Sequence, residues 1–161
     1  GLTVYEYYNY KNINLYGVNI STSLNLLEDL SITSVYTFTD GESDYEDVLD
    51  GISAHSINFN LRYNMFKNWS TLLSLKFNSS KTIDTSLEDE NNLRNELELP
   101  SYSILNLSFT KNLKKGSYIK FGVKNVFDYS DVNNQEGLED FLSTYEPGRR
   151  FFINLNFNLS K

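Results

Sequence analysis

Few side chains of the kinds that most often carry chemistry occur in this sequence. His55 is the single histidine, and the absence of cysteine excludes disulfides, thiolate chemistry and cysteine-based metal sites. The sequence offers no Ser-His-Asp set, no pair of general acids and no glycine-rich phosphate loop. We therefore predict no catalytic residue, no metal site and no cofactor, and we expect that the protein is not an enzyme.

Carboxylates are concentrated in two acidic segments, residues 40–50 and residues 88–98. Their spacing does not match an EF-hand loop, which needs a D-x-[DN]-x-[DN]-G pattern and a distal glutamate. Weak calcium binding by the first segment is the alternative, but we interpret both segments as solvated loops. The formal net charge of -7 argues against nucleic-acid binding, which needs a basic surface.

The remaining candidates for binding are basic and aromatic side chains. The basic candidates are Arg62, Lys76, Lys120 and Lys124, and the aromatic candidates are Tyr129 and Tyr145. What they can contact depends on the elements that position them.

Those elements are predicted to be β-strands, because apolar and polar residues alternate with a period of two along most of the chain. We count about seven such segments of roughly nine to thirteen residues, lengths that suit tilted strands crossing a bilayer. The polar faces are rich in Asn and Ser and carry all four basic candidates. The apolar faces are Val18, Ile20, Thr22 and Leu24; Ile32, Tyr36 and Phe38; Ile57, Phe59, Leu61, Tyr63 and Met65; Thr71, Leu73, Leu75 and Phe77; Leu105, Leu107 and Phe109; Ile119, Phe121 and Val123; and Phe151, Ile153, Leu155, Phe157 and Leu159.

The connections between these segments alternate between short and long. The short ones are Leu27–Leu30, Phe66–Trp69 and Leu113–Gly116, and the long ones are Asp40–Ile52, Ile83–Pro100 and Asp128–Gly148. Outer-membrane barrels have short periplasmic turns and long extracellular loops. We therefore predict an all-β, antiparallel transmembrane barrel with the apolar side chains toward lipid, the polar side chains toward the lumen and the C-terminus in the periplasm. A soluble β-barrel or sandwich, with the apolar face inside, is the alternative.

An odd number of strands cannot close a single-chain barrel with both ends in the periplasm, and an open edge would leave backbone groups unpaired in lipid. We therefore expect residues 1–161 to be the C-terminal part of one barrel domain, with earlier strands upstream.

Two segments resemble known motifs of the TonB-dependent outer-membrane receptors. KNVFDYSD, at residues 124–131, resembles their N-[LV]-F-[DN] element, and YEPGRRFFINLNFNL, at residues 145–159, resembles the P-G-R-x-[FY] element that opens their final strand. A third segment, residues 12–26, is similar to a recurrent strand of the family, although Asn19 stands where Glu is usual. The Asn, Tyr, Lys and Ile bias suggests an AT-rich Gram-negative genome, such as one of the Bacteroidota.

The resemblance implies a 22-stranded barrel around an N-terminal plug, driven by the TonB complex of the inner membrane. It implies uptake of a scarce nutrient, such as an iron chelate, haem, cobalamin or a glycan; a passive porin or structural barrel is the alternative. The expected partners are outer-membrane lipid, the upstream strands, the plug, TonB through an N-terminal region, and an unidentified ligand. The structural motif residues are Asn125, Val126, Phe127, Asp128, Pro147, Gly148 and Arg149. We expect Asn125 to cap its turn, and Arg149 and Arg150 either to pair with loop carboxylates such as Asp128 or Glu146 or to lie at a solvated loop end. The four basic side chains are expected to contact the plug or an anionic ligand, and Tyr129 and Tyr145 to contact ligand from outside.

Overall fold

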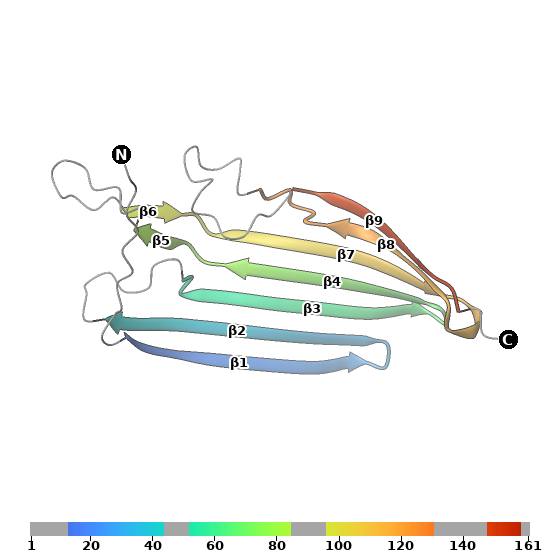
Figure 1. Ribbon diagram of the computed structural model, residues 1–161. Coiled ribbons are helices and arrows are strands. Elements are labelled where there is room, and N and C mark those ends of the chain that lie inside the picture. Colours follow the sequence, from blue (N-terminus) through green and yellow to red (C-terminus); the bar gives the residue numbers. More distant parts are fainter. Residues whose placement is uncertain (1–12, 44–51, 85–95, 131–147, 159–161) are drawn as a thin grey trace, which may run out of the picture.

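The computed structural model describes residues 13–43, 52–84, 96–130 and 148–158, and these form an antiparallel sheet with one small hairpin at its end (Figure 1). The sheet has seven strands in the order β1-β2-β3-β4-β7-β8-β9, and β5 pairs with β6 in a separate two-stranded sheet. The strands are β1 Ile13–Leu27, β2 Leu30–Ser43, β3 His55–Phe66, β4 Trp69–Asn78, β5 Lys81–Asp84, β6 Glu96–Leu99, β7 Tyr102–Asn112, β8 Tyr118–Lys124 and β9 Arg150–Asn156. One 3-10 turn, η1, spans Lys114–Gly116. No helix among the described residues is long and apolar enough to cross a membrane.

The sheet is a meander whose short turns all lie at one end and whose long connections all lie at the other (Figure 1). The turn end joins β1 to β2, β3 to β4, and β7 to β8. The loop end carries the connections that follow β2, β4 and β8. The alternation of short and long connections predicted from the sequence is therefore present.

Two predicted loop boundaries are wrong, in each case because a distant partner extends a strand. β2 continues through Asp40 to Ser43, because the first residues of β1, from Ile13 to Tyr16, pair with this part of β2. The segment from Ile83 to Pro100 contains a hairpin, in which Ile83 pairs with Leu97. In that hairpin Leu99 is among the few buried apolar side chains of the described residues. Neither pairing could be predicted from local sequence, because both lie in acidic segments, which are typical of solvated loops.

The register of the seven strands places the predicted apolar residues within them on the same face of the sheet. Phe157 follows β9, and Leu159 lies outside the described residues. One row of paired residues crosses the whole sheet and is apolar at every position. It consists of Leu24, Ile32, Leu61, Leu73, Leu107, Val123 and Phe151. The face is strongly exposed along both edges: Phe151 is 78% and Val18 is 54% exposed. Soluble monomers rarely expose contiguous apolar patches of more than about a few hundred Å², whereas exposed large apolar side chains line both edges of this face.

The opposite face is polar, and its side chains hydrogen-bond across strands. Ser23, Thr33, Asn60, Ser74 and Asn106 form a polar row over five strands. The Ser74 hydroxyl donates to Asn60 Oδ1 in that row. Thus one face of the sheet is mainly apolar and the other is mainly polar.

The two edges of the sheet are β1 and β9, and no strand of the described residues covers the outer side of either. The described residues therefore do not close a barrel. An exposed edge presents a row of unpaired N–H and C=O groups. In hydrocarbon, each unpaired group would cost on the order of several kcal/mol. Both edges require further strands wherever the sheet lies in lipid.

The face assignment predicts opposite outcomes for the same substitution on the two sides of the sheet. Leu73→Arg in the full-length protein should destabilise the folded barrel by about 2–4 kcal/mol, because it places a charge near the middle of the apolar face. Thr33→Arg is the matched control, since Thr33 lies on the polar row that contains Ser74 and is exposed. Equilibrium unfolding titrations in lipid vesicles measure both. Equal losses of stability in the two variants would contradict the assignment.

Candidate functional site

The end of β8 is closed by a turn in which Asn125 is nearly inaccessible, with 1% exposure. Its φ of 53° is left-handed, a conformation that Asn adopts more readily than most residues. The side-chain Oδ1 accepts the Tyr129 backbone N–H at 3.0 Å, and Nδ2 donates to the Tyr129 carbonyl oxygen at 2.6 Å. The Asp128 N–H donates to the Asn125 carbonyl at 3.0 Å. The Asn125 amide thus holds the turn together from inside.

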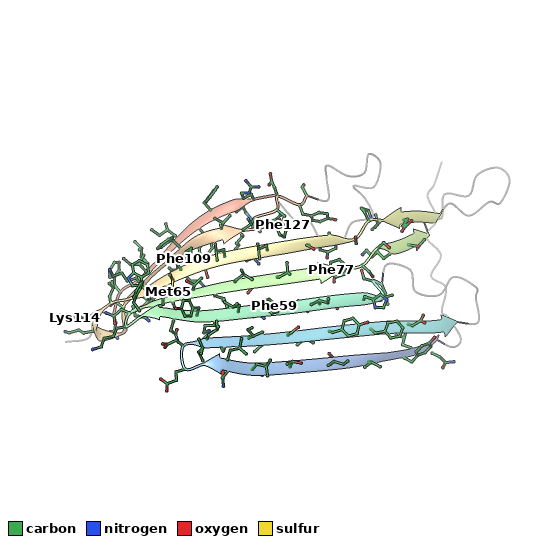
Figure 2. All side chains as sticks on the ribbon, turned by 180° about the vertical axis from the view of Figure 1, so that it is seen from behind. Phe59, Met65, Phe77, Phe109, Lys114 and Phe127 are labelled. Carbon is green, nitrogen blue, oxygen red and sulfur yellow. The ribbon has the colours of Figure 1, made fainter. Side chains whose placement is uncertain are left out.

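The same turn is tied to β7. Asn106 Oδ1 accepts the Asn125 N–H at 2.9 Å, and the Leu105 carbonyl accepts the Val126 N–H at 2.7 Å. These two bonds continue the β7–β8 ladder beyond the last regular pair. Phe127, labelled in Figure 2, follows in the turn and is 58% exposed.

A second set of contacts ties the turn to the start of β9. Asp128 Oδ1 accepts the Arg149 backbone N–H at 2.6 Å, and Arg149 Nε donates to the Val126 carbonyl at 3.0 Å. Gly148 lies so close that a Cβ there would be 2.7 Å from the Asp128 carboxylate. We call residues 125–129 with residues 148–149 the strand-end clip. The Asp128 carboxylate therefore contacts Arg149 through the backbone N–H, and the Arg149 guanidinium donates to the Val126 carbonyl instead. Tyr145, Glu146 and Pro147 lie outside the described residues.

Tyr129 leads from the clip to an aromatic pair. Its ring stacks on Tyr102 with 4.7 Å between centroids and 12° between planes. Asn78 Nδ2 donates to the Tyr102 hydroxyl, and Tyr102 and Asn78 are paired on the polar face at the loop end of β7 and β4. A stacked tyrosine pair offers a flat π surface beside hydroxyls and an amide, a combination suited to planar rings or sugars. The sequence analysis did not identify Tyr102 as a candidate. It could have been found from the alternation in β7, which places Tyr102 on the same face as Asn106.

The four basic candidates share the polar face but do not form one strip. Arg62 pairs with Ser31 and Leu72. Lys76 pairs with Asn58 and Ile104. Lys120 pairs with Thr110 and Asn154. Lys124 pairs with Arg150, and its Nζ lies 5.8 Å from the Phe152 ring centroid. β7 separates the charge of β4 from the two of β8, so the positive potential is spread over the sheet, and it is densest where Arg150 adds to Lys124.

The lone histidine lies on the apolar face. His55 pairs with Phe38, and its ring lies 5.2 Å from the Phe38 ring. Its Nδ1 is 2.8 Å from the Tyr36 hydroxyl. Within the described ranges, no group of three or more His, Asp or Glu side chains could hold a metal ion.

Removal of the Asn125 amide is expected to open the strand-end clip. Asn125→Ala leaves the Tyr129 N–H and carbonyl without their partner, which costs about 1–3 kcal/mol of local stability per buried group and raises amide exchange at Tyr129 about 5- to 150-fold. Asn125→Gly tolerates the positive φ and isolates the loss of the side chain from backbone strain. Asn58→Ala, at an exposed asparagine on the polar face, is the control. Hydrogen exchange followed by mass spectrometry measures the effect; wild-type exchange in both Asn125 variants would contradict the role.

Comparison with known proteins agrees with this architecture. The model of the family "TonB dependent receptor-like, beta-barrel" matches residues 1–126, and this family consists of receptors rather than enzymes. Among solved structures, a mutant of the ferric enterobactin receptor of Pseudomonas aeruginosa has a similar fold, with a TM-score of 0.65 and 18% identity over 86% of this chain. The chain spans 21% of the length of that receptor. No curated protein matches the chain. The family match over most of the sequence, together with a seven-stranded antiparallel sheet that is apolar on one face, identifies the chain as a member of the TonB-dependent receptor-like β-barrel family.

Proposed function

We propose that the chain is part of the barrel wall of a TonB-dependent outer-membrane transporter that takes up a scarce nutrient, such as an iron chelate, haem, cobalamin or a glycan. The observation that carries the proposal is the continuous apolar row from Leu24 to Phe151 on one face of a sheet whose other face is mainly polar; both ends of the row are exposed. That division suits a wall between lipid and a hydrated lumen.

In this proposal the seven strands are the C-terminal part of a 22-stranded barrel, a size associated with a plugged lumen. The upstream strands pair with the exposed edges, and the plug and the TonB-contacting region precede them. The turn end lies in the periplasm with the C-terminus, and the loop end faces outside. Short turns on the periplasmic side and longer connections outside are the pattern of such barrels.

The polar face then lines the lumen, where Arg62, Lys76, Lys120 and Lys124 meet the plug through ion pairs. Their separation over β3, β4 and β8 favours plug contacts at several points over one site for a small anion. At the outer end of the lumen, Tyr129 on its Tyr102 partner is placed to contact ligand, and Tyr145 is proposed for the same role from the outer loop.

The proposal is tested by uptake into cells that carry or lack the full-length gene. Each candidate nutrient is supplied as the growth-limiting source, and labelled uptake is measured. We expect deletion of the gene to abolish the uptake of one nutrient. Deletion of TonB should reduce the uptake of that nutrient equally. Uptake that persists without TonB and rises linearly with concentration would instead establish a passive pore.

The membrane location is checked on the purified full-length protein. A closed outer-membrane barrel is expected to need detergent and to change its gel mobility on heating, because its apolar surface must stay covered. A protein that stays monomeric without detergent would overturn the proposal and favour a soluble β domain.

A further inference from the structure

The turn end of the sheet combines an aromatic cluster with lysines on the apolar face. Trp69 packs edge-on against Phe121 with 6.3 Å between ring centroids, and Phe121 stacks on Phe109 at 5.7 Å. Lys111 pairs with Trp69, and its Nζ lies 4.9 Å above the Trp69 ring. Lys111 is therefore a cation on the mainly apolar face, held over the Trp69 ring.

Two neighbouring turns add further positive charge at this end. Lys67 occupies the turn between β3 and β4, and Lys114 lies in η1 between β7 and β8; both are exposed. A hydrogen bond from the Asn112 N–H to the Asn68 carbonyl, at 2.8 Å, holds the two turns side by side. Figure 2 labels Lys114 at the tip of the sheet, at the end where Met65 and Phe109 also lie. We call Lys67, Lys111 and Lys114 with Trp69 the basic rim.

Acidic side chains lie at both ends of the sheet. At the turn end, Glu28 and Asp29 belong to the β1–β2 turn, which contacts β3 through the bond from the Asn64 N–H to the Asp29 carbonyl. At the loop end, β2 carries Asp40, whose carboxylate accepts the Tyr16 hydroxyl at 2.9 Å. The positive charge of the apolar face is thus concentrated at the turn end, under β4, β7 and β8.

We infer that the basic rim is a docking site for the headgroup of an anionic glycerophospholipid, such as phosphatidylglycerol, in the periplasmic leaflet. Aromatic side chains such as Trp69 settle at the level of lipid headgroups, and lysines beside them attract anionic lipid. Lys111 reaches the phosphate from the apolar face, Lys67 and Lys114 reach it from the turns, and the exposed Phe66, at 71%, packs against acyl chains. This inference rests on the proposed membrane location and on the turn end facing the periplasm.

The test uses the full-length receptor, purified in a neutral detergent and titrated with phosphatidylglycerol, phosphatidylcholine or lipid A. Native mass spectrometry counts the lipid that each sample retains. We expect the wild type to retain phosphatidylglycerol at least five times more than phosphatidylcholine. Each lysine near a headgroup contributes about fivefold in lipid affinity, so the triple variant Lys67→Gln, Lys111→Gln, Lys114→Gln should lose at least tenfold of the phosphatidylglycerol retention.

The matched control is Lys76→Gln, Lys120→Gln, Lys124→Gln, which removes three positive charges from the polar face. It should retain phosphatidylglycerol as the wild type does, and heat-modifiable mobility confirms that both triple variants are folded. Equal losses in the two triple variants, or equal retention of the two phospholipids by the wild type, would overturn the rim site. A preference for lipid A would overturn its assignment to the periplasmic leaflet. A receptor that is monomeric without detergent would instead overturn the proposed membrane location itself.

Discussion

A backbone that enters hydrocarbon must pair every N–H and C=O group within the protein, and this constraint governs the design of the sheet. Seven antiparallel strands meet it everywhere except at β1 and β9. Because the ladder fixes the register, it also fixes which side chains share a face. A slip of one residue in a strand such as β3 would carry Asn58, Asn60 and Arg62 onto the apolar face, so the alternation and the pairing favour the same arrangement.

The strand-end clip supplies hydrogen-bond partners to backbone groups that lie beyond the end of the regular β7–β8 pairing. After β8 the chain leaves the sheet for a long connection. Beyond Lys124 the Val126 N–H still donates to the Leu105 carbonyl of β7, but the regular β7–β8 pairing has ended. The side chains of Asn106, Asn125 and Asp128 accept or supply those bonds in place of a strand. Gly148 leaves the room that the Asp128 carboxylate needs beside the returning chain. The short motifs around Phe127 and Arg149 are therefore best explained as a device for ending and restarting strands, since their side chains bond to backbone.

The features predicted correctly from the sequence are those with a local cause. Alternation from Ile57 to Met65 is fixed by neighbouring residues alone, and it gave the correct face without knowledge of the partner strands. The features missed depend on residues far away in the chain. The strand state of Asp40 depends on Tyr16 and its neighbours in β1. Likewise, the stack of Tyr129 on Tyr102 depends on the clip, whose key contact to Asn106 joins residues nineteen positions apart. Even the spread of the basic side chains follows from β7 lying between β4 and β8, which no pattern within one strand reveals.

The distribution of groups on the polar face limits what this part of the wall can do by itself. Selective binding of a small ligand needs several polar or aromatic groups that converge on one volume. Along most of the face the side chains are small, as in the row from Ser23 to Asn106, and the four basic candidates are spread over β3, β4 and β8. Convergence occurs near the loop end, where Asn78, Tyr102 and Tyr129 meet. In the proposed transporter, a ligand would thus be recognised near the loop end, at Tyr102 and Tyr129, rather than along the rest of the polar face.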